Sequence, residues 1–420
     1  MKLSRRLATA LSILLTATAF YSCTNQPSPV GSSLVPAQNK LTFRALNSWN
    51  AGDSLFFSYR IYPQHIAGGT ALSNGFVGLY KTYQARELIK FIPLYQDSSY
   101  LDSAENSGTM QYAYIQVLLS PYRFGDTSTS LPMHLHCTVN QILTPYDLGA
   151  TWDSLASLSN YSATPVGEYN GVVPRVNDSI LEIPIDTAFL MQMFRNTGTL
   201  LWQYALLPQS GTTGITGIDI ASLSIHVVTL QNATVVDSPV VSGVQMLYIA
   251  SSDEPNTPNE MTMQTGIQQR LHLYMQTSEI PKFSTINAAS LRLTLDTVNS
   301  VFGDNHIRDS LGLSSIDTIF LAFSANGDSL DITNTALTPA MGTRIPGTSQ
   351  YYFPYVAPLV QSWVQGVANY GMVPLQGFSA TIGTGDQFST LDKFVFYSPT
   401  DPDTSHRAHL QVLYSTQAPQ

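Results

Sequence analysis

Short segments in which apolar and polar residues alternate recur throughout this chain, and that pattern predicts β-strands with one buried face. The clearest segment is 290–296, in which three leucines share one face and polar side chains share the other. Residues 223–227 and 410–414 alternate in the same way. Gly, Pro, Asn and Asp separate these segments. From about Leu41 onward we therefore expect an all-β chain of antiparallel β-sandwiches with jelly-roll-like topology.

Two short segments have helical periodicity instead, and we expect one short helix in each half of the chain. In the second half the shared apolar face consists of Val356, Val360, Trp363, Val364 and Val367. In the first half it consists of Phe189, Leu190, Met193 and Phe194, behind the candidate caps Asp186 and Thr187. Each helix is expected to close the end of a sandwich by packing.

An internal repeat relates the two halves of the chain. Residues 110–120 align without gaps on 286–296, and residues 204–211 align on 370–377. The closing strands around Leu223 and Leu410 also correspond, and all three matches occur in the same order. The repeat predicts two tandem copies of one domain.

The predicted domains are residues 41–235 and 236–416, with the join near residues 233–241. A chain of 420 residues is also too long for one compact core, which independently favours two domains.

Several segments carry motifs of a known family. In the second copy they are residues 271–281 (LHLYMQTSEIP), 285–295, 356–370 (VAPLVQSWVQGVANY), 396–398 and 409–414, and in the first copy residues 150–153 (ATWD). These motifs resemble those of DNRLRE domains, exported β-sandwich modules related to a carbohydrate-binding module family. The sequence departs from the family pattern at Met275, where an acidic residue is usual, and at Ala408, where a proline is usual. The resemblance implies a sandwich fold and a binding role.

The first 22 residues have the pattern of a secretory signal peptide. Lys2, Arg5 and Arg6 precede an apolar run that is too short to span a bilayer permanently. The following Cys23 resembles the lipobox cysteine of Bacteroidota-type lipoproteins, and that resemblance implies lipidation at Cys23. The polar, proline-rich residues 23–40 then predict a tether. We expect an exported protein whose N-terminal lipid anchors it to the outer membrane. Because no acidic run follows Cys23, the periplasmic face is favoured over the cell surface.

Charge restricts the partners of the exported chain. Charged residues make up 11% of the sequence, against about 25% in an average soluble domain. Loss of the three basic residues of the signal peptide changes the net charge from −9 to −12. Nucleic acid requires clustered Lys and Arg, so we expect no nucleic-acid partner. Attraction to anionic lipid is also not expected, which leaves the anchoring to the acyl chains.

The sequence contains two cysteines, Cys23 and Cys137. If Cys23 is acylated, no intrachain disulfide can form. Strand alternation places His134 and His136 on one face and Cys137 on the other, whereas zinc ligands must converge. We therefore expect a buried free thiol at Cys137 and no metal site.

The sequence contains no recognised motif for catalysis or for calcium binding. No zinc-protease helix, nucleophile elbow, phosphate loop or dinucleotide fingerprint occurs, and the scarce glutamates show no catalytic pairing. We expect a protein that is not an enzyme and holds no cofactor. Acidic loops leave a structural calcium open, although turns explain the same residues: Asp296, Asp304, Asn305, Asp309, Asp328, Asp331, Asp401 and Asp403.

Sugars bind to exposed aromatic rings beside hydrogen-bonding groups, because a pyranose has an apolar C–H face and polar hydroxyls. Trp152, Trp202 and Trp363 are expected in the core. The candidate stacking residues are Trp49, Tyr351, Tyr352 and Tyr355.

The sequence thus predicts a non-catalytic, membrane-anchored lipoprotein that displays β-sandwich modules. Its partner would be extracellular polysaccharide, or an envelope protein if the role is adhesive or structural. Two alternatives stay open: a polysaccharide-active enzyme with an unrecognised site, and an accessory subunit of a secretion or assembly machine that pairs through a sheet edge.

Overall fold

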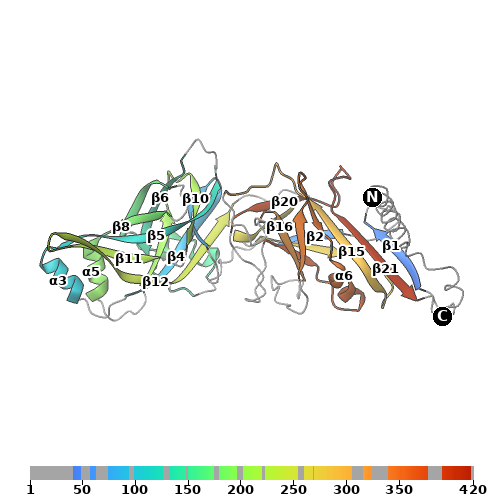
Figure 1. Cartoon of the computed structure of the whole chain (residues 1–420), viewed down its shortest axis with the longest axis horizontal. Coiled ribbons are helices and arrows are strands. Elements are labelled where there is room, and N and C mark those ends of the chain that lie inside the picture. Colours follow the sequence, from blue (N-terminus) through green and yellow to red (C-terminus); the bar gives the residue numbers. More distant parts are fainter. Residues whose placement is uncertain are drawn as a thin grey trace, which may run out of the picture.

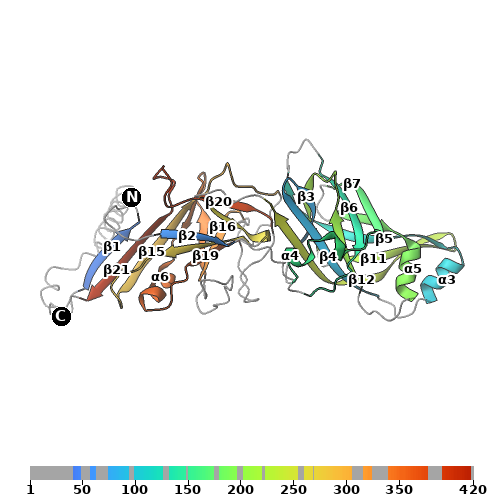
Figure 2. The same cartoon turned by 180° about the vertical axis from the view of Figure 1, so that it is seen from behind.

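The structure is a computed structural model. It describes residues 41–48, 57–62, 74–93, 99–125, 132–147, 150–174, 179–195, 202–219, 223–253, 260–267, 269–304, 316–323, 339–376 and 390–417. Within these residues strands predominate, and they form antiparallel sheets in a sandwich-like or barrel-like arrangement. The all-β fold predicted from alternation is therefore confirmed. Two β-rich bodies follow one another along the longest axis of the molecule (Figures 1 and 2).

The N-terminal sandwich is built on a ten-stranded sheet with the order β10-β3-β4-β12-β11-β5-β8-β7-β6-β9. Its strands are β3 (Asn74–Tyr80), β4 (Tyr83–Pro93), β5 (Met110–Gly125), β6 (His134–Gln141), β7 (Gly167–Val172), β8 (Ile180–Ile185), β9 (Trp202–Pro208), β10 (Gly214–Asp219), β11 (Ser224–Gln231) and β12 (Thr234–Ser252). Further pairings of β10 with β5 and of β4 with β9 fold this sheet back on itself. The enclosed core includes Ile115, Val227 and Leu190.

The C-terminal sandwich contains a nine-stranded sheet with the order β1-β21-β15-β18-β17-β16-β19-β14-β2 and a two-stranded ribbon, β13-β20. The strands are β1 (Leu41–Asn47), β2 (Phe57–Tyr62), β13 (Glu260–Gln264), β14 (Arg270–Met275), β15 (Thr285–Thr294), β16 (Thr318–Phe323), β17 (Ala340–Arg344), β18 (Gln350–Phe353), β19 (Met372–Leu375), β20 (Lys393–Tyr397) and β21 (His409–Gln417). The ribbon contributes Met261, Phe394 and Phe396 to the same core as the large sheet.

The described residues include four α-helices, α3 (Ser99–Asn106), α4 (Trp152–Leu155), α5 (Thr187–Arg195) and α6 (Ala357–Val364), and the 3-10 turns Leu158–Asn160 and Thr265–Ile267. The predicted faces of α5 and α6 are largely buried, and the Ala188 N–H donates to the predicted cap Asp186 at 2.9 Å. Val367 lies beyond α6 and is exposed, contrary to the prediction. Among the described residues, the N-terminal sandwich holds three helices where one was predicted. α3 consists mostly of polar residues and α4 is a single turn of four residues, so neither gives a strong helical pattern.

The segments related by the internal repeat lie on strands with similar partners. Residues 110–120 belong to β5 and residues 286–296 cover most of β15. β5 pairs with β11, and β15 pairs with β21. In each sandwich a helix precedes the strand of the second matched segment, α5 before β9 and α6 before β19.

The strand pairing differs from the predicted domain limits of 41–235 and 236–416. β12, which was assigned to the second domain, pairs with β11 and β4 of the N-terminal sandwich. β1 and β2, which were assigned to the first domain, pair with β21 and β14 of the C-terminal sandwich. The turn at Asn232 and Ala233, both with positive φ, folds β12 directly back onto β11. The segment that precedes the N-terminal sandwich therefore completes the C-terminal one.

The two sandwiches meet at a buried polar junction. The Tyr122 hydroxyl donates to the Asp392 carboxylate at 3.1 Å and accepts from the Leu391 N–H at 2.9 Å. The Gly303 N–H and the Gln376 amide also donate to Asp392, both at 2.8 Å. Apolar residues from both sandwiches surround this junction. Burial and the nearby Asp392 carboxylate raise the pKa of Tyr122, so its hydroxyl stays protonated and can donate.

Candidate functional site

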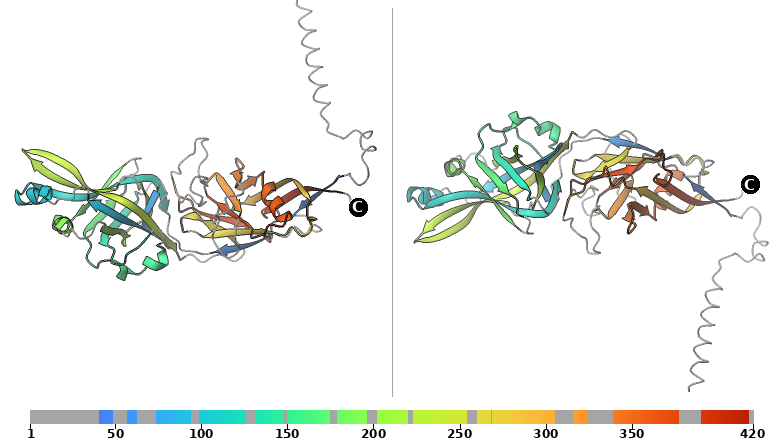
Figure 3. Two further views of the ribbon diagram at one scale, coloured as in Figure 1. Left: turned by 90° about the horizontal axis from the view of Figure 1, so that it is seen from below. Right: turned by 90° about the horizontal axis from the view of Figure 1, so that it is seen from above.

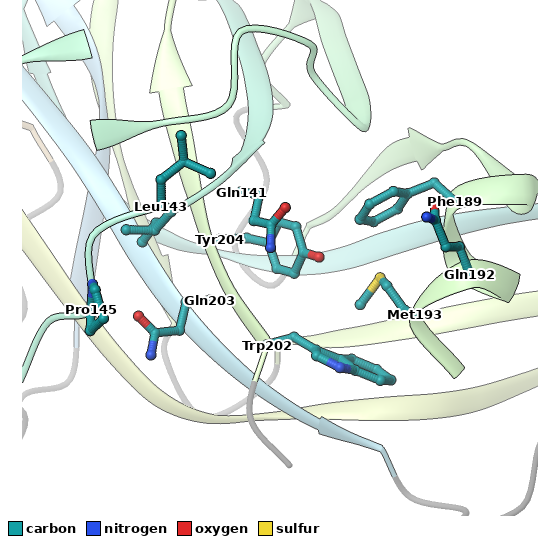
Figure 4. A pocket seen from close by; sticks show the side chains of 10 residues that line it. Gln141, Leu143, Pro145, Phe189, Gln192, Met193, Trp202, Gln203 and Tyr204 are labelled. Atoms are coloured by element: carbon teal, nitrogen blue, oxygen red, sulfur yellow. The ribbon is translucent and has the colours of Figure 1, made fainter. Parts of the chain in front are cut away.

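A pocket of about 300 Å³ opens at the end of the N-terminal sandwich that carries α5. This volume lies at the lower end of the range for ligand sites, roughly 300–1,000 Å³. Side chains of α5 and of β9 line it together with the segment that follows β6 (Figure 4). The lining residues with rings or amides are Gln141, Phe189, Gln192, Trp202, Gln203 and Tyr204.

Backbone pairing fixes the strand side of this pocket. β9 pairs with β6 on one side and with β4 on the other, so Gln203 and Tyr204 lie on a central strand of the sheet. The Ile142 N–H donates to the Gln203 carbonyl at 2.9 Å, which holds the segment after β6 against β9. These main-chain hydrogen bonds fix the backbone from which the pocket-lining side chains project.

The aromatic rings of the pocket are held by edge-to-face packing. The rings of Phe189 and Tyr204 meet at a centroid distance of 5.8 Å and an angle of 87°. Phe194, on the buried side of α5, packs against Trp202 at 5.3 Å and 74°. Such pairs are favourable and orient each ring. Trp202 is buried in the core, as predicted from the sequence, but it also lines the pocket.

The glutamine side chains supply the hydrogen-bonding capacity of the site. Gln141 and Gln192 are exposed, whereas Gln203 is partly buried. Within the described residues, the Gln203 Oε1 atom is buried and accepts no hydrogen bond. A buried carbonyl oxygen without a donor is unfavourable, typically by about 1–3 kcal/mol.

The pocket is electrically neutral. None of the ten residues that line it in the described part of the chain carries a formal charge. Burial raises the pKa of Tyr204, so its phenol is neutral as well. A glycosidase requires a pair of carboxyl groups that flank the scissile bond, and this lining contains none. The lining therefore offers a ligand aromatic rings and amide groups without a formal charge.

The predicted stacking residues do not belong to this pocket. Tyr351 is fully buried in the core of the C-terminal sandwich, and its hydroxyl donates to the Ile316 carbonyl. The prediction for Tyr351 is therefore wrong, because a ring without exposed surface cannot stack on a sugar. Tyr352 faces the other side of β18, where Arg292 lies 5.3 Å from its ring centroid. Tyr355 is 77% exposed in the segment between β18 and α6.

Two further predicted residues, Cys23 and Trp49, lie outside the described residues, as do the signal peptide 1–22 and the tether 23–40. The prediction of a lipid anchor at Cys23 therefore stays a prediction. In the part of the chain that is described, no helix has the length and apolar character needed to cross a bilayer.

The histidine–cysteine segment has the alternation that the sequence predicts. Cys137 is a buried free thiol on β6, and burial raises its pKa to about 12, which makes the thiolate inaccessible at neutral pH. On the opposite face, the His136 ring lies 2.8 Å from the Glu168 carboxylate and 3.0 Å from the Ser210 carbonyl.

Two of the acidic loops considered for calcium serve as turns. The Asp296 carboxylate accepts from the Val298 N–H at 2.9 Å, and the Asp403 carboxylate accepts from the Ser405 N–H at 2.9 Å. Among the described residues, no group of three or more His, Cys, Asp or Glu side chains is placed to hold a metal. Asn305, Asp309, Asp328 and Asp331 lie outside the described residues.

The sequence did not identify the pocket, because its residues come from three separate segments. The helical pattern of residues 189–194 predicted packing for Phe189, and its ring does pack on Tyr204. A usable indication existed in the amides Gln141, Gln192 and Gln203, which flank apolar residues in three segments. The pairing of β6 with β9 brings Gln141 beside Gln203 and Tyr204, and α5 adds Gln192 to the same pocket.

No family model, no curated protein and no solved structure matches the chain. The site is therefore interpreted from its own geometry and chemistry.

Proposed function

We propose that this protein is an exported, membrane-tethered binding protein for neutral polysaccharide. The pocket beside α5 carries this proposal, because it combines aromatic rings, three glutamine amides and an uncharged lining. The rings suit the apolar face of a pyranose, and the amides suit its hydroxyls, both as donors and as acceptors. The resemblance of the chain to DNRLRE domains supports the same class of function.

The position of the pocket fits a display role. Residues 23–40, the proposed tether, lead directly into β1, which pairs with β21. α5, which lines the pocket, lies at the opposite end of the molecule from β1 (Figures 1 and 3). With the lipid on Cys23, the pocket would face away from the membrane and reach material at a distance from it.

The decisive experiment measures binding of the soluble fragment 24–420 to a glycan array, followed by titration of any positive glycan. The variants Gln192→Ala and Phe189→Ala shorten two side chains of the pocket that are not fully buried. We expect each to weaken binding by about tenfold, since a hydrogen bond or a ring contact is worth about 1–1.5 kcal/mol. Gln111→Ala, an exposed glutamine on β5, is the matched control and should bind normally.

Either of two results would contradict the proposal. One is the absence of binding to any neutral glycan by the folded fragment. The other is binding that all three variants retain in full, which would place the glycan elsewhere on the molecule.

A further inference from the structure

A serine, a histidine and an aspartate form a continuous hydrogen-bonded row on the outer face of the N-terminal sandwich. The Ser224 hydroxyl lies 2.9 Å from Nε2 of His226. Nδ1 of the same ring lies 2.9 Å from the Asp237 carboxylate. Since an ionised carboxylate only accepts, Nδ1 carries the proton and Nε2 is free to accept from the serine. This is the order of groups that activates a serine for nucleophilic attack.

The local structure accounts for this arrangement. Ser224 and His226 are two residues apart on β11, so both side chains project from the same face, while Ile225 and Val227 enter the core. The hairpin turn brings Asp237 of β12 opposite Val228. A register shift between Ile225 and His226 interrupts the β11–β12 ladder beside the histidine. Bulges of this kind are common next to active sites because they re-aim side chains.

Tyr114, on the neighbouring strand β5, contacts both His226 and Asp237. Its ring stacks on His226 at 5.2 Å with an angle of 22°. Its hydroxyl donates to the second oxygen of Asp237 at 2.7 Å. Burial and the Asp237 carboxylate raise the pKa of Tyr114, so the phenol keeps its proton. The imidazole is therefore held in one orientation from its face and from one nitrogen.

We propose that Ser224, His226 and Asp237 form a nucleophilic site that hydrolyses esters of short acyl chains. The Ser224 proton passes to His226 Nε2 as Oγ forms a bond to the acyl carbon. The bond from that carbon to the alcohol oxygen then breaks, and His226 returns the proton to the departing alcohol. In the second half of the reaction a water molecule gives a proton to His226 Nε2 and its oxygen forms a bond to the acyl carbon. The bond from that carbon to Ser224 Oγ then breaks, the serine takes the proton back from His226, and the carboxylic acid leaves.

The neighbours of Ser224 can stabilise the oxyanion that forms in this reaction. In the strand register Gln116 of β5 lies on one side of Ser224 and Ser242 of β12 lies on the other. Directly paired residues have Cβ atoms about 4.5–5.5 Å apart and face the same way. The Gln116 amide thus offers donors on one side of the nucleophile. On the other side the Ser242 hydroxyl makes a long bond of 3.4 Å to the Gly243 carbonyl and can turn from it to the oxyanion.

The surroundings define the class of substrate. The site lies on an outer sheet face, where the Asp237 carboxyl is 46% exposed, and this leaves room for a bulky alcohol. The 50% exposed ring of Tyr112, adjacent to Tyr114 at 6.0 Å, can contact its apolar part. A small acyl group needs no deep pocket. An acetyl ester on a larger polar molecule fits these conditions, and the inference is independent of the binding pocket at α5.

The test uses the full soluble fragment with p-nitrophenyl acetate as the substrate and a fluorophosphonate as the labelling reagent. We expect turnover above that of free imidazole, and mass spectrometry should find the label on Ser224. Ser224→Ala and His226→Gln should each lower kcat/KM by at least about a hundredfold, and Asp237→Asn by about tenfold or more.

The matched control is His136→Gln, which removes a second histidine–carboxylate pair of this sandwich. In that pair the other ring nitrogen faces a backbone carbonyl instead of a hydroxyl. This variant should keep full activity. Circular dichroism shows whether each variant is folded. No turnover and no label in the wild-type fragment would overturn the proposal, and so would activity that Ser224→Ala retains.

Discussion

Glu87 is a carboxyl group enclosed within the N-terminal sandwich. Burial raises its pKa from 4.5 to about 8, and a hydrogen bond from the Phe76 N–H at 3.0 Å offsets only part of that effect. Gly75 provides the space, since a Cβ atom there would lie 2.1 Å from the carboxylate oxygen. The folded protein therefore holds a proton on Glu87 at neutral pH, whereas the unfolded chain does not.

This difference predicts a loss of stability with rising pH. Between about pH 4.5 and 8 the folded state binds one proton more than the unfolded state at Glu87, so the free energy of unfolding falls across that window. The fall is up to roughly 5 kcal/mol at about 1.4 kcal/mol per pH unit. Glu87→Gln should match the wild type near pH 4 and exceed it at pH 9, as measured by urea denaturation at each pH. The exposed Glu279→Gln is the control, and parallel pH profiles for all three proteins would contradict the assignment.

At this scale the sequence predicts some side chains well and others poorly. The strand period assigned Cys137 to a buried face. The same period, applied to β18, would have buried Tyr351 and Phe353 together, yet the tyrosine cluster suggested an exposed platform. Alternation was the more reliable guide, because a strand with one buried face must bury every second residue.

Arg86 joins one strand to a separate structural element. It is 4% exposed on β4, and its guanidinium donates to the carbonyls of Leu155 and Ala156, both at 3.0 Å. The guanidinium carbon of Arg86 lies over the Trp152 ring of α4, 4.5 Å from the centroid of that ring. Thr151 and Ser154 close the same short helix with a capping box. One arginine therefore holds the end of α4 against the sheet.

Replacement of this side chain should loosen α4. Arg86→Met keeps most of the apolar stem but removes the donors. The Ala156 carbonyl then loses its partner, and the Leu155 carbonyl keeps only the bond from the Tyr161 hydroxyl at 2.8 Å. We expect a loss of about 2–4 kcal/mol in the free energy of unfolding, together with a change in Trp152 fluorescence. Arg195→Met, which removes an exposed ion pair with Asp102 and Glu105, should have little effect. Equal stability of the two variants would show that the Arg86 contacts are dispensable.

At the element scale the sequence predicted what depends on local pattern. The strands around residues 223, 290 and 410 and the helices α5 and α6 follow from their periods, and α5 also from its cap Asp186. The polar helix α3 carries no strong apolar face and was not predicted. The sequence alone shows that Ser224 and His226 are two residues apart on a predicted strand and so share a face. Their aspartate partner, Asp237, is identified only by the β11–β12 register.

At the scale of the whole molecule, the assembly depends on contacts between distant parts of the chain. β1 pairs with β21 from Leu41↔Gln417 to Asn47↔Gln411, and Leu46 enters the core of the C-terminal sandwich. Such a pairing joins residues more than 360 positions apart, and no local pattern specifies it. The repeat predicted two sandwiches in tandem. It did not predict that β1 and β2 pair in the C-terminal sandwich or that β12 pairs in the N-terminal one, which only the strand register shows.

The pairing of β1 with β21 predicts that the C-terminal sandwich, and not the N-terminal one, depends on β1. A variant of the soluble fragment that lacks residues 24–47 should lose amide protection along β21 and β15, because β21 becomes an edge strand. Protection along β11 and β5 should persist, since β12 already covers β11. Removal of residues 24–40 alone keeps β1 and serves as the control. Hydrogen–deuterium exchange with peptide-level mass spectrometry separates the outcomes. Loss of protection in the N-terminal sandwich would instead mean that the chain completes its own first domain and that β1 pairs locally.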